Sequence, residues 1–317
     1  MGTSTGTRIK HSVIFAATLG LLSACTGCTT ATSTNSAPVS ERVAEAAAEQ
    51  IHNSASHPDI GEHDLSKIVA ARSAEDRARD DARHPVQTLE FFGLQPGMKV
   101  AEVLPGGGWY SKIIAQYVGH DGAIYGVNYQ DRLWAEFGWS EERVARSIGS
   151  TATFADNAQE WAGFAIPAQG FTFANVPEDL NGQVDAVLFI RALHNLQRFN
   201  SVGVLDEALT NAFAMLKPGG VLGVVQHRAP ETASEEWASG SNGYLKVSNV
   251  VRRMEAVGLV FEAASEINAN PKDQPTEDDF VWRLPPANSG AKDDATKAAM
   301  AAIGESDRMT LRFRKPL

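Results

Sequence analysis

Cysteine is scarce in this chain of 317 residues, because both cysteines, Cys25 and Cys28, lie near its start. The long remainder therefore has no disulfide, no zinc site with thiolate ligands and no cysteine nucleophile. A domain of this composition suits an oxidising compartment. Positive charge is also in short supply: 28 basic residues stand against 38 acidic ones, the net charge is -10, and no basic block interrupts the chain. This balance argues against a nucleic-acid partner.

Long hydrophobic runs are missing as well. The apolar stretch 13–22 is too short to span a bilayer, which needs about 20 residues. Two basic residues precede this stretch, and the tetrapeptide Leu-Ser-Ala-Cys follows it at 22–25. This arrangement is typical of a bacterial export signal, so we predict a signal peptide at 1–24.

The tetrapeptide resembles the lipobox of bacterial lipoproteins, in which a lipid is attached to the cysteine thiol. The resemblance implies lipidation of Cys25 and a lipid anchor in the cell envelope. Thr26, which is not acidic, follows this cysteine, and a non-acidic residue at that position resembles the pattern that sorts lipoproteins to the periplasmic face of the outer membrane. The alternative is a C-x-x-C redox or metal pair of Cys25 and Cys28, which lacks a second pair. Residues 25–40, rich in Thr, Ser, Ala and Pro, are predicted to form a flexible tether.

Two regions follow the tether. Residues 41–84 are mostly polar and predict a helical extension, and its irregularly spaced histidines lead us to expect no metal ion. Residues 85–317 contain apolar segments in which strand and helix patterns alternate, with strands predicted at 185–190, 221–225 and 259–267. In the last strand, from Met309, apolar and polar residues alternate, which predicts a half-exposed strand. The pattern predicts a doubly wound α/β domain with a mainly parallel sheet.

A glycine turn is the most informative part of this domain. The run 100–128 begins with an apolar strand, continues with Gly106, Gly107 and Gly108, and then predicts an amphipathic helix and a second strand. Glycine allows positive φ and lets a ligand lie against the backbone, whose free N–H groups favour polar or anionic atoms. The alternative is a tight turn without a ligand.

Several motifs occur in the order found in one enzyme family. They are the PGGGWY turn at 105–110, the segment DAVLFIRALHNL at 185–196, the LKPGG turn at 216–220 and the terminal strand. Residues 85–317 therefore resemble the class I S-adenosylmethionine (SAM)-dependent methyltransferases, and most of all a group of exported predicted methyltransferases with a PGGGWY motif. The resemblance implies a Rossmann-like, doubly wound seven-stranded sheet, methyltransferase activity and SAM as methyl donor.

The resemblance also implies a set of cofactor contacts. They are Glu102 at the end of the first strand, Gly106, Gly107 and Gly108 beside the methionine moiety and ribose, Asn128 at the end of the second strand, and Phe189 and Ile190 near the adenine or the donor pocket. Asn128 departs from the family, which usually has an acidic residue there. Because an amide binds hydroxyl groups less strongly than a carboxylate, we expect a weakened ribose contact.

Polar residues at the ends of later strands are candidates for the acceptor site. His194 and His227 follow neighbouring strands, at the edge where open α/β sheets bind ligands. We predict that one of them acts as a base, that Arg191 and Arg228 hold a carboxylate or phosphate of the acceptor, and that Tyr110 covers the donor pocket. The alternative is that these histidines cap or pack, and that Tyr110 is a core aromatic.

Three functions are compatible with these features. The first is a SAM-dependent methyltransferase of the cell envelope that acts on a small-molecule or envelope-component acceptor. The second is a non-catalytic small-molecule-binding or scaffold lipoprotein on the same fold, because SAM is made in the cytoplasm. The third, a nicotinamide-dependent oxidoreductase, lacks the G-x-G-x-x-G motif. The sequence makes no prediction of an oligomeric state.

Overall fold

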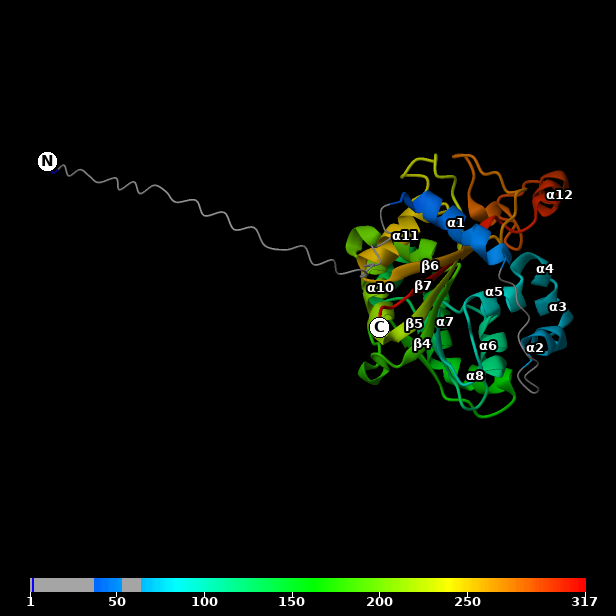
Figure 1. Ribbon diagram of the computed structural model, residues 1–317. Coiled ribbons are helices and arrows are strands. Elements are labelled where there is room, and N and C mark those ends of the chain that lie inside the picture. Colours follow the sequence, from blue (N-terminus) through cyan, green and yellow to red (C-terminus); the bar gives the residue numbers. More distant parts are fainter. Residues whose placement is uncertain (1, 3–36, 53–63) are drawn as a thin grey trace. The chain divides into compact units, whose positions relative to one another are not determined.

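A seven-stranded sheet lies at the centre of the protein (Figure 1), whose computed structural model describes Gly2 and residues 37–52 and 64–317. The strands are β1 (Lys99–Val103), β2 (Ala123–Asn128), β3 (Ala168–Thr172), β4 (Val184–Ile190), β5 (Leu216–His227), β6 (Val260–Ser265) and β7 (Arg308–Arg314). Their order is β3-β2-β1-β4-β5-β7-β6. Strand β7 is antiparallel to both of its neighbours, β5 and β6, and all other neighbouring strands are parallel. The predicted seven-stranded, mainly parallel sheet is confirmed.

Several predicted features lie outside the described residues. They include the signal peptide at 1–24 apart from Gly2, the lipidation site Cys25, and residues 26–36 of the tether. Residues 38–317 form one compact unit, which contains the sheet and the described N-terminal helices. In the described part of the chain, no helix is both long and apolar enough to cross a membrane.

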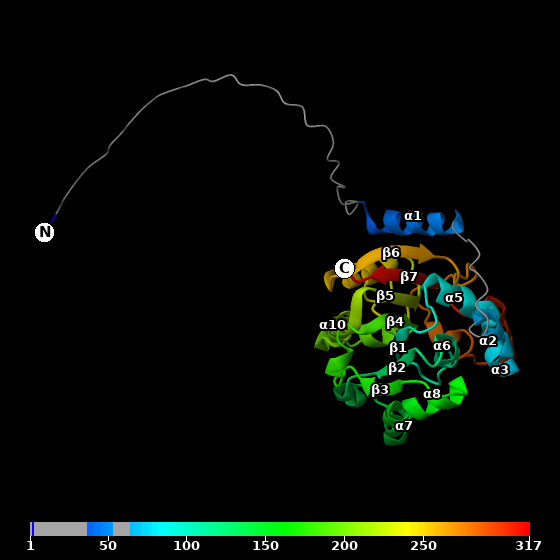
Figure 2. The same ribbon diagram turned by 60° about the horizontal axis from the view of Figure 1, so that its bottom comes forward.

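Helices cover both faces of the sheet, as Figure 2 shows. One face packs against α9 (Leu193–Gln197), α10 (Val204–Met215) and α11 (Val247–Ala256), and the other against α2 (Leu65–Ala71), α5 (Pro85–Phe91), α6 (Ser111–Val118) and α8 (Phe154–Ala162). The central strand β4 serves both cores. Val187 and Phe189 point to the first, Leu188 and Ile190 to the second. A parallel strand that is buried on both faces needs the continuous apolar sequence seen here.

The last strand differs from its prediction. The alternation from Met309 predicts a half-exposed strand, but β7 lies between β5 and β6 and is covered on both faces. Its polar residues have partners in the protein. Asn268 Nδ2 donates to the hydroxyl of the fully buried Thr310, and Arg312 donates to the carbonyl of Phe91 and to Glu262.

The predicted strand–turn–helix–strand unit is confirmed over β1, the glycine turn, α6 and β2. The turn requires positive φ at Leu104 (54°), Gly106 (58°) and Gly108 (75°). A Cβ at Gly108 would lie 2.4 Å from the ring of Trp161, so only glycine fits there. The turn thus places the start of α6 at the carboxyl end of the sheet.

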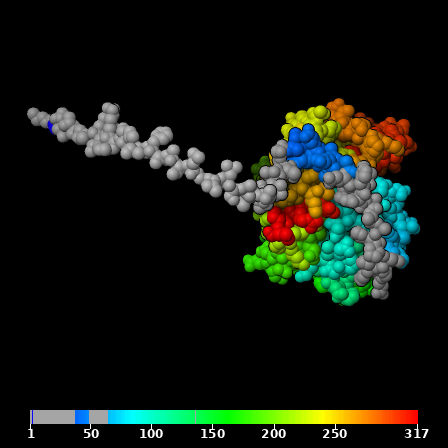
Figure 3. Space-filling view, in the orientation of Figure 1, coloured from blue at the N-terminus to red at the C-terminus, as the bar shows by residue number. Residues whose placement is uncertain are grey.

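The N-terminal helices pack on two parts of the domain. The first, α1 (Val39–His52), lies along β6, where Arg42 forms an ion pair with Glu255 of α11 (Figures 2 and 3). Helices α2, α3 (Ala74–Arg77) and α4 (Asp80–Arg83) lie beside α5 and α6, and Trp109 Nε1 donates to the carbonyl of Asp76. Helices α3 and α4 thereby come close to the glycine turn.

The remaining helical elements connect these parts. They are α7 (Glu141–Ala152), α12 (Asp294–Ile303) and the 3₁₀ helices η2 (Asp131–Phe137), η3 (Glu178–Leu180), η4 (Asn200–Val202) and η5 (Val281–Arg283). Helix α7 packs against β2 and β3. The segment that contains η5 crosses the carboxyl end of the sheet, where its residues line a cavity.

Candidate cofactor and acceptor site

Two cavities meet at the glycine turn, at the carboxyl ends of β1 and β4. The large cavity has a volume of about 480 Å³ and the small cavity about 250 Å³. Both are lined by Leu104, Pro105, Gly106, Arg191 and Asn195. This edge of an open α/β sheet is where such folds bind their ligands.

The glycine turn leaves room for a ligand. A Cβ at Gly106 or Gly107 would have no protein atom within 4 Å, and both residues line the large cavity. Their backbone therefore faces open space, in contrast to Gly108, which packs against Trp161. A cofactor that extends from one cavity to the other can lie directly against Gly106 and Gly107.

Asn128 lies in the wall of the small cavity, and its side chain is already bonded within the protein. Its Nδ2 donates to the carbonyl of Ser147 at 3.1 Å and to Thr151 Oγ1 at 2.7 Å, both in α7. Its Oδ1 accepts from the N–H of Tyr129 at 2.9 Å. Asn128 therefore fixes α7 to the end of β2 and keeps only spare acceptor capacity on Oδ1 for a ligand hydroxyl.

Aromatic rings form much of the small cavity's wall. Tyr129, Trp139, Phe154 and Trp161 line it, and the ring of Phe154 meets that of Trp161 edge-on at a centroid distance of 5.9 Å. Burial raises the pKa of Tyr129 to about 12, so its hydroxyl is neutral. The small cavity thus combines four aromatic side chains with neutral polar ones, and Arg191 is its charged lining residue.

Glu102 lies at the end of β1 in the wall of the large cavity. Its carboxyl is buried, and Ser111 Oγ donates to Oε2 at 2.5 Å. Burial raises the pKa of Glu102 to about 7, although Ser111 and the cation of Arg191 act in the opposite direction. Near neutral pH this carboxyl is divided between its neutral and charged forms.

His194 lies in the first turn after β4 and lines the large cavity. Gln226 Nε2 donates to the carbonyls of His227 and Gly243, so Gln226 Oε1 is the atom that faces His194. That oxygen lies 3.2 Å from Nδ1 of His194, which must therefore carry the proton and donate. Burial lowers the pKa of His194 to about 4, which leaves Nε2 unprotonated at neutral pH.

His227 ends β5 beside His194, with a distance of 5.2 Å between the ring centroids. Its Nδ1 lies 2.5 Å from Ser306 Oγ. Burial and the neighbouring His194 lower the pKa of His227 well below its ordinary value. The structure brings both predicted histidines together in the wall of the large cavity, where both are neutral at pH 7.

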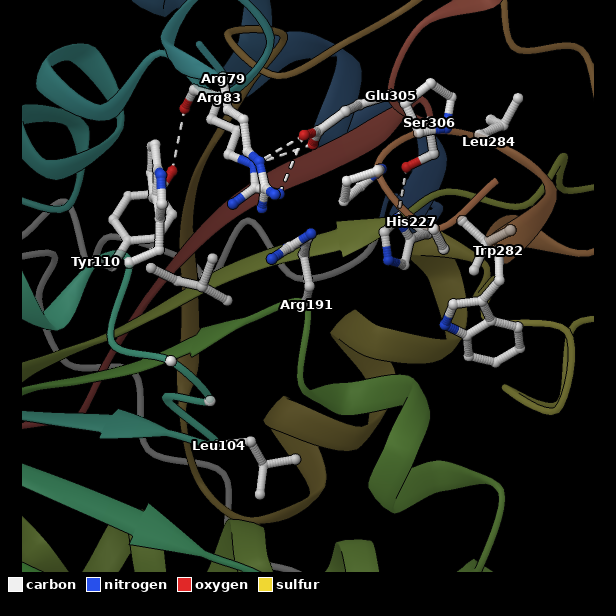
Figure 4. Close-up of a pocket in the computed structure, with 18 of the residues that line it drawn as sticks. Arg79, Arg83, Leu104, Tyr110, Arg191, His227, Trp282, Leu284, Glu305 and Ser306 are labelled. Atoms are coloured by element: carbon white, nitrogen blue, oxygen red, sulfur yellow. Dashed lines mark hydrogen bonds and ion pairs between the residues drawn. The ribbon is translucent and has the colours of Figure 1, made fainter. Parts of the chain in front are cut away.

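Arginines form another part of the same wall (Figure 4). Arg83 of α4 donates from Nε to Glu305 Oε1 and Oε2 at 3.1 and 3.0 Å, and Arg308 donates to Oε2 at 3.0 Å. The Arg191 guanidinium points toward Arg83 in Figure 4. Burial and the charge of Arg83 lower the pKa of Arg191 to about 10, so Arg191 remains a cation at neutral pH.

Most of the predicted site residues line the two cavities. Glu102, Gly106, Gly107, Tyr110, Ile190, Arg191, His194 and His227 line the large cavity, and Gly106, Asn128 and Arg191 line the small one. Tyr110 is buried, and its hydroxyl donates to the carbonyl of Arg83 at 3.0 Å. Residues from four separate segments of the sequence thus meet at one edge of the sheet.

Phe189 and Arg228 are not brought to either cavity. Neighbouring residues of a strand point to opposite faces, so Phe189 enters the opposite core from Ile190 and stacks on Phe173. Arg228 forms ion pairs with Glu266 and Asp307, which raise the pKa of its guanidinium. Gly108 packs against Trp161 and lines neither cavity.

Sequence reasoning missed several residues of the site. Arg83 and Glu305 are 222 positions apart, and no sequence pattern links them. Trp161 and Trp282 line the small and the large cavity from segments that were not assigned to a site. The sequence alone does not distinguish an aromatic residue that lines a cavity from one that packs in the core.

The fold and one family match identify the type of domain. Residues 82–184, less than half of the chain, match the family described as protein-L-isoaspartate(D-aspartate) O-methyltransferase (PCMT). The match covers β1, the glycine turn, α6, β2 and β3. The domain has the class I methyltransferase fold. The family match makes it a domain of the SAM-dependent methyltransferase type, and SAM is the methyl donor of that type.

Solved structures of similar fold share little sequence with this chain. A SAM-dependent methyltransferase from Aquifex aeolicus is 18% identical, with coverage of 65% of this chain and 93% of that chain and a TM-score of 0.43. A Burkholderia thailandensis 1,6-didemethyltoxoflavin-N1-methyltransferase, solved with bound 1,6-didemethyltoxoflavin and S-adenosylhomocysteine, is 13% identical, with coverage of 83% of this chain and 94% of that chain and a TM-score of 0.43. The [4+2]-cyclase SpnF is 17% identical, with coverage of 78% of this chain and 84% of that chain and a TM-score of 0.48. These values carry no argument about chemistry. No curated protein matches the chain.

Proposed function

We propose that this chain is a SAM-dependent methyltransferase of the bacterial cell envelope that acts on a small-molecule or envelope-component acceptor. The observation that carries the proposal is the meeting of two cavities at Gly106, in a domain of the methyltransferase type. The small cavity offers space for a nucleoside, and the large cavity offers space for the methionine part and for an acceptor. Their junction at Gly106 and Arg191 is then the place of methyl transfer.

The residues present fit the cofactor. Gly106 and Gly107 leave the space that it needs against the backbone, the aromatic wall of the small cavity can stack on adenine, and Asn128 Oδ1 can accept from a ribose hydroxyl. Glu102 faces the methionine side. When bound, SAM supplies the methyl group as an electrophile.

The protein's own part is alignment. In-line transfer requires that the acceptor atom be held close to the methyl group, and Arg191 at the junction of the cavities can orient a polar acceptor. His194 has Nε2 free to accept a hydrogen bond from an acceptor hydroxyl. With a pKa of about 4 it is a weak base, so we propose that it orients that hydroxyl and takes its proton only as the methyl bond forms.

The envelope location rests on the sequence. The lipobox-like tetrapeptide at 22–25 and the tether at 25–40 support a lipid anchor on Cys25. In cells fed a labelled fatty acid, we expect the wild-type chain to carry the label and to be found in the membrane fraction. The Cys25→Ala variant should carry no label. A Cys28→Ala variant is the matched control and should keep its label. An unlabelled wild-type chain would remove the anchor from the proposal.

The cofactor site is tested by calorimetry of the purified chain with S-adenosylhomocysteine. We expect a dissociation constant on the order of micromolar, weakened at least tenfold in Gly106→Val, because the new side chain would enter the open space against which the cofactor lies. Gly182→Val is the matched control. Gly182 also has positive φ (66°) and open space around its Cβ position, but lines neither cavity.

A non-catalytic binding lipoprotein is the second candidate, and Asn128 favours it. Both amide hydrogens of Asn128 are bonded to α7, so this residue has no free N–H donor for the ribose of a ligand. If no heat of binding appears with millimolar S-adenosylhomocysteine, this second candidate replaces the first. If wild type and the Gly182→Val control bind and Gly106→Val does not, the methyltransferase is supported.

A further inference from the structure

The part of the large cavity around Glu305 carries more positive than negative charge. Arg83 and Arg191 line the cavity there, and Arg308, which does not line it, bonds Glu305 together with Arg83. Their cations lower the pKa of Glu305, so it is ionised. Glu102 adds only part of a negative charge near neutral pH, since its pKa is about 7. A surplus of positive charge remains in a partly buried space.

The other titratable groups that line the cavity leave this local surplus in place. His194 and His227 are neutral, and Tyr110 is buried with a raised pKa. Of the remaining charged lining residues, Asp76 is paired with Lys112 at 3.0 Å, and Glu75 and Arg79 have opposite charges. Buried cations without counterions are costly, and a site that keeps them is suited to receive an anion.

Arg191 differs from Arg83 and Arg308 because its guanidinium is not bonded to Glu305. Among the described residues, no side-chain hydrogen bond or ion pair engages its guanidinium, and its buried Nε has no partner. Its backbone is held at a φ of 56°, a left-handed conformation that L-residues seldom adopt and that is costly to maintain. Arg83, which is almost fully buried, likewise has Nη1 without a hydrogen-bond partner. The two groups face each other across the cavity (Figure 4).

We propose that one anionic group of the methyl acceptor, a carboxylate or a phosphate, binds between Arg191 and Arg83. The inference rests on the proposed function and narrows its class of acceptor to anionic molecules. The planar guanidinium groups present paired N–H donors that match the oxygens of such anions, and charge-assisted bonds of this kind are strong. Glu305 holds Arg83 in place, and Arg191 is free to bind.

The position of Glu305, which bonds Arg83, favours the acceptor over the cofactor's own carboxylate as the source of the anion. Glu305 lies just before β7, on the side of β4 opposite to β1 and β2. The small cavity, with Asn128, lies toward β2. Of these charged residues, only Arg191 lines both cavities.

The test uses the full chain and two probes, inorganic phosphate and acetate, with sodium chloride at equal ionic strength as reference. The rise of the unfolding temperature with probe concentration gives an apparent dissociation constant, both without and with saturating S-adenosylhomocysteine. We expect saturable binding of at least one probe by wild type. Arg191→Gln should weaken it at least tenfold, and Arg191→Lys, which keeps the charge, less so.

Arg77→Gln is the matched control, because Arg77 is an exposed arginine of the neighbouring α3 and lines neither cavity. It should bind the probes within twofold of wild type. Circular dichroism establishes that each variant is folded. Preference for phosphate or for acetate then tells which anion the acceptor carries.

A second arm separates the two sources of the anion. S-adenosylhomocysteine has a carboxylate, whereas 5′-methylthioadenosine has the same thioether nucleoside without one. We expect Arg191→Gln to bind both nucleosides within threefold of wild type. If this variant loses only S-adenosylhomocysteine, the arginines hold the cofactor and the proposal is overturned.

The probe titrations test the anion site, and the nucleoside titrations test the proposed methyltransferase. Absence of saturable probe binding in wild type, or equal binding in Arg191→Gln, also overturns the anion site. Failure of wild type to bind either nucleoside contradicts the proposed methyltransferase, yet the probe titrations without S-adenosylhomocysteine still decide whether the anion site exists.

Discussion

The two cavities share the glycine turn but differ in how their polar groups are satisfied. In the small cavity, the amide hydrogens of Asn128 are bonded to α7, and apart from Arg191 the wall consists of aromatic and neutral side chains. In the large cavity, Arg83 and Arg191 keep guanidinium nitrogens without hydrogen-bond partners. A surface with internally satisfied polar groups recognises shape, and one with spare charged donors recognises charge. The difference separates a nucleoside side from an acceptor side.

The largest expected effect comes from Glu305→Gln. Glu305 is the carboxylate that bonds both Arg83 and Arg308, and its loss leaves two buried cations without a counterion. We expect the free energy of unfolding to fall by about 3–5 kcal/mol, as measured by urea denaturation. Glu266→Gln breaks an exposed ion pair with Arg228 and should cost less than about 1 kcal/mol. Equal losses in the two variants would show that burial of the pair does not matter.

Glu102→Gln should change the pH dependence of stability. The Glu102 carboxyl releases its proton near pH 4.5 when unfolded but near pH 7 when folded. It therefore stabilises the protein below pH 4.5, and this contribution is lost as the pH rises through 7, by about 3 kcal/mol in total. In the Glu102→Gln variant, the free energy of unfolding does not contain this pH-dependent contribution, because glutamine does not ionise.

His194 acts in the opposite direction, since its folded pKa of about 4 lies below the ordinary 6.5 and stability falls as the pH drops through that window. The histidines are common to wild type and Glu102→Gln. The difference between the two unfolding curves at pH 4.5 and pH 8 therefore isolates the carboxyl. A difference that stays constant with pH would mean that Glu102 ionises normally.

Asn128→Asp should weaken the protein and fail to improve the cofactor site. A carboxylate cannot donate to the carbonyl of Ser147, so α7 loses its attachment to β2. We expect a loss of about 1–3 kcal/mol in urea denaturation and no gain in S-adenosylhomocysteine affinity. Asn157→Asp places the same charge in the same cavity while breaking only a long, exposed bond, and should cost less. A more stable, tighter-binding Asn128→Asp would refute this assignment of the amide.

The smallest expected effect on stability is that of Arg191→Gln. Because no hydrogen bond or ion pair with a described residue engages the Arg191 guanidinium, its removal breaks none, and the lost attraction to Glu305 and Glu102 is opposed by relieved repulsion from Arg83 and Arg308. We expect a change within about 1 kcal/mol of wild type. A loss as large as that of Glu305→Gln would mean that Arg191 supports the fold and is not held free for a ligand.

The sequence predicted the framework of the fold better than its interior details. The glycine turn and the apolar β4 could be predicted because each depends on local pattern and burial. The covered position of β7 could not, since the same alternation fits a half-exposed strand and one whose polar residues find buried partners such as Asn268. Long-range pairing is invisible to periodicity.

The site follows the same division. The sequence located His194, His227 and Arg191 at strand ends, and topology alone brought them to one edge. It offered no means to find that Arg83 and Glu305 pair, or that Asp307 and Glu266 hold Arg228 away from the cavity. Strand alternation alone could have separated Phe189 from Ile190.

A crystal structure of the chain with S-adenosylhomocysteine would test the division of the site into a nucleoside side and a charged acceptor side. We expect the nucleoside in the small cavity against Trp139 and Asn128, the thioether beside Gly106, and the guanidinium of Arg191 still open toward Arg83. A nucleoside bound elsewhere, or a methionine carboxylate seated between Arg191 and Arg83, would contradict the division of the site into a nucleoside side and a charged acceptor side.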